Sequence, residues 1–349
     1  MMQDMERYSC QLLLPGFGAQ AQQLLQQARV LIVGMGGLGC PAAQYLVSSG
    51  VGTLGMADYD IISLSNLHRQ VLYSEHEVGQ KKVRIAAARL KVQNPHVQVV
   101  VHDERVDVGN VAALIAAYDI VIDATDNFDT HYLLNDAAVI AAKPLVHGAI
   151  YQYEGHVAVW NMLNPDGTRG PNYRDLFPEV NAMQVPSCND GGVLPTIAGI
   201  IGCMQANEAI KIITRQEGIL SGRMLVFDAQ AMQSRIIKIA ARTNTDIKEL
   251  PRPAAISLLD KGQLKELQGC DDVLLVDVRT PGEHAAFNVG GINIPLQEIE
   301  GNIQQLNKGK RLVFYCASGK RSMQAAQHLK ESFPMLDVSS LREGISDWD

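Results

Sequence analysis

The sequence lacks the basic excess that would indicate a polyanionic partner and the long apolar run that would indicate a membrane protein. Its 349 residues carry 30 Lys and Arg against 37 Asp and Glu, a formal net charge of −7. Without a basic excess we expect neither nucleic acid nor an acidic membrane as a partner. The longest apolar run, residues 193–204, contains Pro195 and is shorter than the roughly 20 residues that span a bilayer. No internal repeat is present.

Cysteines are few and widely separated, and the sequence contains no Cys-x-x-Cys pair. This spacing does not suit a disulfide framework. The first residues place acidic side chains before a short apolar run and lack the basic flank of a signal peptide. We therefore expect reduced thiols and a cytoplasmic protein. The six cysteines are Cys10, Cys40, Cys188, Cys203, Cys270 and Cys316.

Apolar strand-like runs alternate with helix-length segments in the first part of the chain. This alternation predicts a doubly wound, Rossmann-like α/β fold with a mostly parallel sheet. Residues 153–160 instead alternate apolar with polar side chains, which predicts an antiparallel extension. A helix at 193–214 and two further strands complete the domain. The parallel strands are expected at 29–34, 52–58, 96–101, 119–125 and 144–150.

The length corresponds to about two domains. A polar stretch with two prolines, residues 242–254, is the predicted linker. A second α/β pattern follows it, with strands at 273–278 and 311–316. We therefore predict a larger domain at 1–241 and a smaller α/β domain at 255–349.

A glycine-rich turn lies between the first strand and the first helix of the larger domain. Such a turn lets backbone N–H groups at a helix N-terminus face phosphate. Asp58, at the end of the second strand, is placed to accept a hydrogen bond from a ribose hydroxyl. These features alone fit an NAD-type oxidoreductase or another nucleotide enzyme. The turn consists of Gly34, Met35, Gly36, Gly37, Leu38 and Gly39.

Further polar residues favour a triphosphate over a dinucleotide. Arg69 and Lys82 supply cations for phosphates, and Asp126, at the end of the fourth strand, supplies a carboxylate for Mg²⁺. Hydride transfer needs no such set. Each residue alone also fits a simpler role, an exposed cation or a helix cap.

Residues 6–240 resemble the adenylyltransferases of the MoeB, ThiF and HesA type. The resemblance rests on the joint occurrence of Gly-x-Gly-Gly-Leu-Gly, Asp-x-Asp, Ser-Asn-Leu-x-Arg-Gln, Val-Gly-Gln-x-Lys and Asp-Ala-Thr-Asp-Asn. It implies ATP-dependent adenylation of the C-terminal glycine of a ubiquitin-like sulfur carrier, release of pyrophosphate, and a homodimer. It also implies that Asp58 binds the ribose, that Asn66, Arg69 and Lys82 bind the phosphates, and that Asp126 binds magnesium. The nucleotide site would be completed by Asp60, Gln70 and Asn127.

The chain departs from that family at three places. Cys10 stands where the family has an arginine that reaches the ATP of a dimer partner, so adenylation is slowed, rescued by Arg7, or abolished. Residues 172–175 replace one Cys-x-x-Cys pair of a zinc site, so we predict no structural zinc. Cys188 matches a cysteine that some relatives link covalently to the carrier, although an ordinary loop thiol fits equally well.

The second domain contains a candidate sulfur-carrying cysteine. Cys316 ends a strand and precedes a helix N-terminus and two cations, an environment that favours thiolate. A phosphatase loop usually needs one more residue to surround a phosphate. The six-residue length of this loop instead suits a sulfane sulfur. Residues 255–349 resemble a rhodanese domain, in which Asp277 and Arg279 are expected to brace the fold. The six-residue persulfide loop is Cys316, Ala317, Ser318, Gly319, Lys320 and Arg321.

The two domains together predict one reaction sequence. A persulfide on Cys316, supplied by thiosulfate or a cysteine desulfurase, would attack the acyl-adenylate, displace AMP and leave a thiocarboxylate on the carrier. Proteins of this plan serve molybdopterin, thiamine and thiolated-tRNA pathways, and the sequence does not choose among them. Two alternatives stay open: an adenylation-impaired scaffold with an active rhodanese domain, and an NAD-type oxidoreductase.

Overall fold

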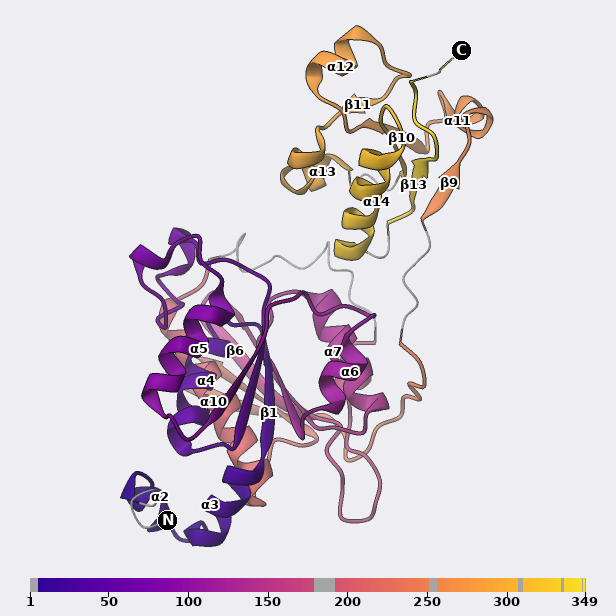
Figure 1. The fold of residues 1–349 in the computed structure, drawn as a ribbon. Helices are drawn as coiled ribbons and strands as arrows, with labels where there is room; N and C mark the ends of the chain where they lie inside the picture. Colours follow the sequence, from indigo (N-terminus) through magenta and orange to yellow (C-terminus); the bar gives the residue numbers. More distant parts are fainter. Residues whose placement is uncertain are drawn as a thin grey trace. The chain divides into compact units, whose positions relative to one another are not determined.

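The computed structural model describes residues 6–178, 192–250, 256–306, 310–333, 336–346 and 348 (Figure 1). The chain divides into two compact units, Met1–Pro251 and Arg252–Asp349. Each unit has its own sheet and its own hydrophobic core. Among the helices of the described ranges, none has the length and apolar character that crossing a membrane requires.

The first unit is built on an eight-stranded sheet with the order β3-β2-β1-β4-β5-β6-β7-β8. Strands β1 to β5 pair in parallel, and β6, β7 and β8 extend the sheet antiparallel. The doubly wound sheet with an antiparallel extension is therefore confirmed. The strands are β1 (Arg29–Val33), β2 (Thr53–Ala57), β3 (Gln98–His102), β4 (Ile120–Asp123), β5 (Leu145–Tyr151), β6 (Glu154–Trp160), β7 (Arg223–Asp228) and β8 (Gln233–Lys238).

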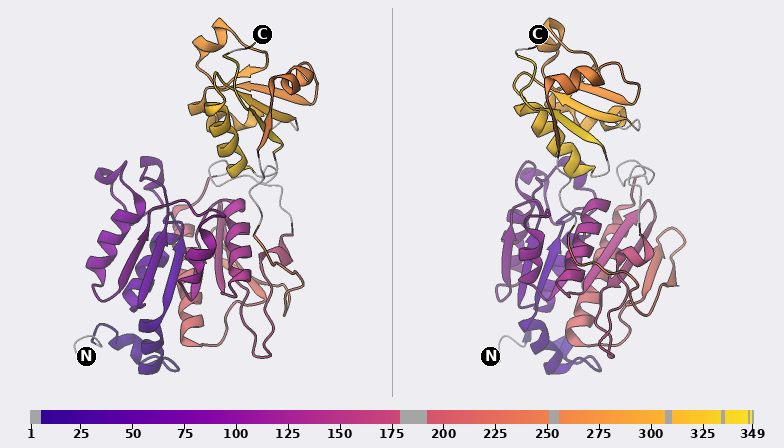
Figure 2. Two further views of the ribbon diagram at one scale, coloured as in Figure 1. Left: turned by 45° about the vertical axis from the view of Figure 1, so that its right-hand side comes forward. Right: turned by 90° about the vertical axis from the view of Figure 1, so that its right-hand side faces the viewer.

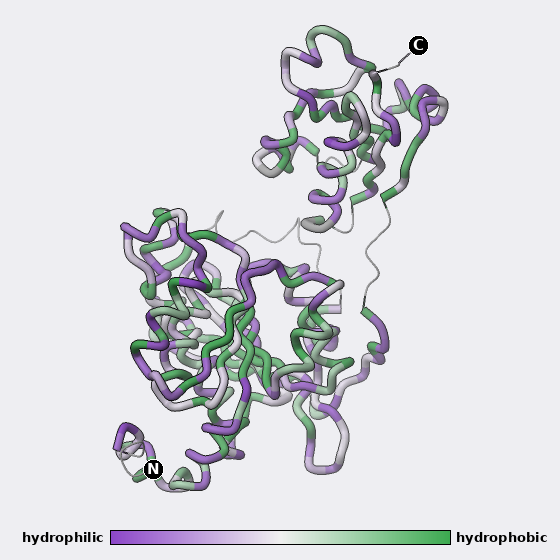
Figure 3. The backbone as a smooth tube through the Cα atoms, in the orientation of Figure 1, coloured by the Kyte–Doolittle hydropathy of each residue, from purple (hydrophilic) through white to green (hydrophobic). Residues whose placement is uncertain are grey.

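Helices cover both faces of this sheet (Figures 1 and 2). On one side lie α4 (Gly39–Ser49), α5 (Lys82–Gln93) and α10 (Pro195–Thr214), and on the other α6 (Val111–Ala116) and α7 (Phe128–Ile140). A strand covered on both faces buries consecutive side chains, and β1 is buried at every position after Arg29. Its apolar run stands out in Figure 3.

The strand order reverses direction beside β1. The chain passes from β1 to β2 and β3 on one side, then returns to place β4 and β5 on the other. In open α/β sheets, ligands bind at the carboxyl ends of the strands at such a reversal. The glycine turn follows β1 and Asp126 follows β4, so the topology brings these two motifs to the same edge of the sheet.

Some elements had no clear sequence signal. Two helices, α2 (Ser9–Leu12) and α3 (Gly18–Gln27), precede β1, and the short α8 (Tyr173–Leu176) follows β6. Part of the stretch predicted as a linker is attached to the first unit, since Thr243 N donates to Arg169 O at 3.1 Å. Leu250 packs against the core on the α7 side of the sheet.

The second unit has a five-stranded parallel sheet with the order β11-β10-β12-β13-β9. Its central strand, β12, is fully buried from Leu312 onward and leads directly to Cys316. The strands are β9 (Ser257–Leu259), β10 (Val273–Asp277), β11 (Ile292–Asn293), β12 (Arg311–Tyr315) and β13 (Val338–Leu341). The helices are α11 (Lys261–Leu267), α12 (Pro281–Ala286), α13 (Ile303–Leu306) and α14 (Lys320–Ser332).

Candidate active sites

The glycine turn after β1 is too tight for side chains at two positions. Gly34 has φ +92°, and a Cβ there would lie 2.7 Å from the Ala124 carbonyl oxygen. A Cβ on Gly39, where α4 begins, would collide with the Gly34 carbonyl oxygen. Glycine at these positions lets the backbone of β1, the turn and β4 approach closely.

Asp58 contacts the turn directly. Its Oδ2 accepts a hydrogen bond from Met35 N at 2.7 Å, and its Oδ1 accepts one from Asp60 N at 2.8 Å. Burial raises the pKa of Asp58, although Lys82 and these hydrogen bonds oppose the shift. The carboxylate therefore orders the glycine turn, and its predicted contact with a ribose stays a prediction.

Arg69 and Gln70 lie against the glycines. A Cβ on Gly37 would be 3.4 Å from Arg69 Cγ, and one on Gly36 would be 3.5 Å from Gln70 Nε2. Gln70 is only 4% exposed, and its Oε1 has no hydrogen-bond partner. A buried amide oxygen without a partner needs a polar group, which a nucleotide in the turn would supply. The residues present therefore fit a bound nucleotide.

The backbone of η1 (Leu64–Asn66) leads these side chains to the turn. Asn66 O accepts hydrogen bonds from Arg69 N at 3.1 Å and Gln70 N at 3.0 Å. The guanidinium of Arg69 lies at the surface, where its Nη1 is 2.7 Å from His68 Nε2. The Ser-Asn-Leu-His-Arg-Gln segment thus presents a cation beside the glycine turn.

Lys82 is the first residue of α5, and its side chain is only 5% exposed. Its Nζ lies 2.9 Å from Asp60 Oδ2. A lysine this deeply buried needs a charged partner, and Asp60 supplies it. The structure therefore pairs two residues that the sequence assigned separately to nucleotide binding.

Asp126 is exposed just beyond β4. Burial and then the charge of Asp60 are the main causes that raise the pKa of Tyr59, and Asp126 contributes to the same shift. Asp126 therefore lies within electrostatic range of the segment after β2. The next residue, Asn127, caps α7, since its Oδ1 accepts from Thr130 N at 2.9 Å.

One cation near this site was missed by the sequence analysis. Arg105 lies 5.7 Å from the centre of the Tyr59 ring. Burial raises the pKa of Asp129 to about 6, and the charge of Arg105 opposes that shift. No motif contains Arg105, so only the fold could place it here.

A buried Asp–His–His cluster supports the turn that carries Asp126. Asp123 Oδ2 accepts from His131 Nδ1 at 2.7 Å and from His147 Nδ1 at 3.1 Å, and Oδ1 accepts from Thr125 Oγ1 at 2.7 Å. Burial raises the pKa of Asp123, but the charges and hydrogen bonds of both histidines have the larger effect. The pKa of Asp123 therefore lies below its ordinary value. Within the described residues this is the group with metal-ligand spacing. In this group Asp123 Oδ2 already bonds to Nδ1 of both histidines.

The three departures from the family pattern lie in different surroundings. Cys10 is exposed on α2. Arg7 donates to Gln93 O at 3.1 Å, at the end of α5. Asn172 and Asp175 form a capping box at α8. The absence of structural zinc stays a prediction. Cys188 lies outside the described residues.

In the second unit, the loop after β12 surrounds Cys316. The side chain is fully buried, and its Sγ accepts from Ser322 N at 3.3 Å. Gly319, with φ +80°, precedes α14, and a Cβ there would collide with Arg342 O. Ile345 N donates to Cys316 O at 2.9 Å. The segment after β13 therefore holds the loop against the start of α14.

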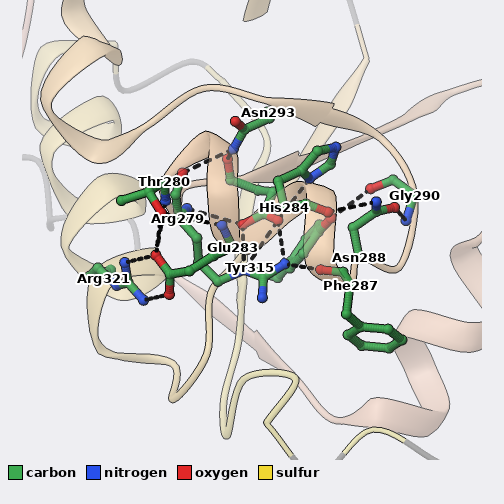
Figure 4. A network of polar contacts seen from close by, with 11 residues as sticks. Arg279, Thr280, Glu283, His284, Phe287, Asn288, Gly290, Asn293, Tyr315 and Arg321 are labelled. Atoms are coloured by element: carbon green, nitrogen blue, oxygen red, sulfur yellow. Dashed lines mark hydrogen bonds and ion pairs between the residues drawn. The ribbon is translucent and has the colours of Figure 1, made fainter.

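Charged residues of α12 and the end of β10 brace this loop (Figure 4). Arg321 donates to both oxygens of Glu283, at 2.9 and 2.7 Å. Asp277 and Arg279 form a buried ion pair at 2.6 Å, and His284 Nδ1 lies 2.9 Å from the same carboxylate. One of the two predicted cations of the loop is therefore paired with a carboxylate. Lys320 is exposed.

The fold and these two sites define an α/β nucleotide-binding enzyme joined to a smaller domain with a reactive-cysteine loop. The ThiF family profile matches residues 8–248, and the rhodanese-like domain profile matches residues 260–349. The chain belongs to the ThiF family. It is an adenylyltransferase with a C-terminal rhodanese-like sulfurtransferase domain.

Relatives named for both activities match nearly the whole chain. The adenylyltransferase and sulfurtransferase MOCS3 of Drosophila persimilis is 39% identical over 380 residues, covering 99% of this chain and 83% of the relative. The Anopheles gambiae protein of that name is 36% identical over 386 residues, covering 99% and 86%.

Solved structures resemble the chain in fold. Escherichia coli MccB with AMPCPP and MccA superposes with a TM-score of 0.59 at 22% identity, covering 68% of this chain and 73% of that one. A structure of PaaA superposes with a TM-score of 0.54 at 26% identity, covering 68% and 74%. In the MccB complex the fold holds an ATP analogue.

Proposed function

We propose that this enzyme uses ATP to activate the C-terminal glycine of a small ubiquitin-like sulfur carrier and then converts it to a thiocarboxylate with sulfur carried on Cys316. The observation that carries the proposal is the meeting of Arg69, Gln70 and the Lys82–Asp60 pair at the glycine turn, in the same chain as the Cys316 loop. The MOCS3 relatives, named for both activities, support it.

In the first step a carboxylate oxygen of the carrier attacks the α-phosphorus of ATP, and the bond to pyrophosphate breaks. This chemistry needs positioning and charge neutralisation, and it needs no protein nucleophile. Arg69 and Lys82 are the proposed phosphate cations. The exposed Asp126 carboxylate suits a hard cation, and Mg²⁺ bound there would neutralise phosphate charge.

In the second step the terminal sulfur of a Cys316 persulfide attacks the acyl carbon and AMP leaves. The carrier is then joined to Cys316 through an acyl disulfide. A second thiol must attack this disulfide to release the thiocarboxylate, and Cys188 is a candidate for a covalent intermediate. Thiosulfate or a cysteine desulfurase persulfide would supply the sulfur.

The proposal includes five further assignments. The adenylyltransferase domain covers residues 1–241, the linker 242–254 and the sulfurtransferase domain 255–349. The enzyme acts as a homodimer in the cytoplasm and has no structural zinc. The carrier belongs to molybdopterin, thiamine or tRNA-thiolation chemistry. The competing candidate, an adenylation-impaired scaffold, is favoured by the exposed Cys10 on α2.

The mass of a candidate carrier after incubation with ATP, magnesium and thiosulfate tests the proposal. We expect the wild-type enzyme to produce the thiocarboxylate mass and Cys316→Ser to stop at the AMP adduct. Cys270→Ser is the matched control, because Cys270 is an exposed cysteine of the same unit. An unmodified carrier, together with no carrier-dependent ATP–pyrophosphate exchange, would establish the scaffold. Sulfur transfer by Cys316→Ser would refute the sulfur relay.

A further inference from the structure

A chain of hydroxyl groups leads from β13 to the sulfur of Cys316. Ser340 Oγ donates to Ser322 Oγ at 3.0 Å, and Ser322 Oγ lies 3.5 Å from Cys316 Sγ. All three side chains have no exposed surface. Ser340 belongs to none of the motifs identified in the sequence, and it sits opposite Phe314 on the strand beside β12.

The hydrogen bonds of Ser322 must change when the sulfur ionises. A serine hydroxyl has one hydrogen to donate and two lone pairs that accept. With a neutral thiol, the Ser322 oxygen accepts from both Cys316 Sγ and Ser340, and its hydrogen points at Gly319 O, 3.1 Å away. When Cys316 releases its proton to solvent, the sulfur can only accept, so the Ser322 hydrogen must turn toward it.

Ser340 can donate to the Ser322 oxygen in both states. A hydroxyl that accepts a hydrogen bond becomes a stronger donor, because bonded groups polarise one another in a low-dielectric interior. Bonds to a charged acceptor gain more than bonds to a neutral one. The Ser340 bond is therefore worth more when Cys316 is a thiolate.

We propose that Ser340 is a positioning residue for the sulfurtransferase reaction, acting through Ser322 to stabilise the thiolate of Cys316. The inference rests on the proposed role of Cys316, because a thiolate is the form that accepts sulfane sulfur from a donor. It adds a residue on a neighbouring strand to the sulfur site.

Ultraviolet thiolate absorbance measured against pH tests the relay in the full chain. Each variant is compared with the same variant carrying Cys316→Ser, so that the difference isolates one sulfur. In Ser340→Ala we expect the titration of Cys316 to move to higher pH by a few tenths of a unit, with roughly two- to fourfold less thiolate at pH values well below the midpoint.

Ser339→Ala is the matched control. Ser339 is the neighbouring buried serine on β13, and its Oγ accepts from Arg311 Nη2 at 3.1 Å instead. We expect no movement of the Cys316 titration in this variant. An unchanged titration in Ser340→Ala, or an equal movement in Ser339→Ala, overturns the proposal.

A double-mutant cycle with Ser322→Ala tests the route through Ser322. If Ser340 acts through Ser322, Ser340→Ala adds no further movement in the Ser322→Ala background. A full additive movement refutes the route. Melting temperatures of all variants identify any that fail to fold, and Ser340→Thr, which keeps the hydroxyl, should restore the wild-type titration.

The outcome is separable from that of the proposed function. Thiolate absorbance reports on Cys316 whether or not the residue carries sulfur. If Cys316→Ser retains sulfur transfer while the Ser340 effect is present, the proposed function fails and the relay stands. If Cys316→Ser abolishes transfer and Ser340→Ala moves nothing, the relay fails and the proposed function stands.

Discussion

At the scale of single residues, the two predicted phosphate cations, Arg69 and Lys82, differ in burial and in ion pairing. Lys82 is buried and paired with Asp60 at 2.9 Å, so its charge is partly neutralised before a nucleotide binds. Arg69 lies at the surface beside Gly37, and none of the ion pairs found between described residues includes it. A half-exposed guanidinium beside the glycine turn is the better placed of the two to meet transition-state charge.

Replacing Arg69 with alanine should therefore lower carrier-dependent ATP–pyrophosphate exchange by about a hundredfold or more, the usual cost of removing one charge-assisted donor. Arg84→Ala is the control, because Arg84 is a 71%-exposed arginine of α5 that pairs with Asp103. We expect its exchange rate to stay close to wild type. Similar rates for both variants would exclude Arg69 from phosphate binding.

At the scale of secondary structure, the ion pair between α12 and the first turn of α14 supports the sulfur loop. The hydrogen bonds from Arg321 are the main cause that lowers the pKa of Glu283 to about 2. A carboxylate with a lowered folded-state pKa stabilises the fold above its ordinary pKa. That stability is lost as the pH falls toward the lowered value. The contribution of this pair is therefore present at neutral pH and declines in acid.

Glu283→Gln should accordingly lower the melting temperature of the sulfurtransferase unit at pH 7. The difference from wild type should shrink as the pH falls from about 4.5 toward 2, because over this range the wild-type carboxylate is protonated in the unfolded state before it is protonated in the folded state. Thermal unfolding of the full chain at several pH values measures this difference. A difference that is the same at every pH would show that the charge of Glu283 contributes nothing.

At the scale of the whole molecule, one chain carries both the adenylyltransferase domain and the sulfurtransferase domain. The first unit includes residues up to Leu250, and β9 begins at Ser257, so a short segment joins the two units. A short connection gives a high effective concentration of one site for the other. Under the proposed function, joining the units would therefore favour reaction of the acyl-adenylate with the persulfide over reaction with water.

Inserting about ten Gly and Ser residues between residues 250 and 256 should lower thiocarboxylate formation roughly fivefold, because effective concentration falls with about the −3/2 power of linker length. ATP–pyrophosphate exchange and thiosulfate-dependent sulfur transfer, measured separately, should not change. An unaffected overall rate would show that the linker does not limit the encounter of the two sites.

Much of the fold followed from sequence pattern alone. Buried parallel strands and their crossover helices leave strong apolar periodicity, so β1, β2 and β4 fall within their predicted runs, and β5 extends one residue beyond its run. The antiparallel β6 was recognisable because apolar and polar residues alternate along its own sequence. Short elements such as α2, α8 and β9 carry too few residues for a pattern, and tertiary contacts rather than propensity hold them.

The sequence by itself determined the class of enzyme, because glycine turns, strand-end carboxylates and a six-residue cysteine loop place characteristic residues a few positions apart. Only the tertiary structure decided which side chains face one another across distant segments. Asp123 with His131 and His147, and Ser340 with Ser322, are separated by up to 24 residues and share no local motif. Their contacts exist because parallel strands and the helices packed on them bring those positions together, and hydrogen bonds between buried groups form only once water has been excluded.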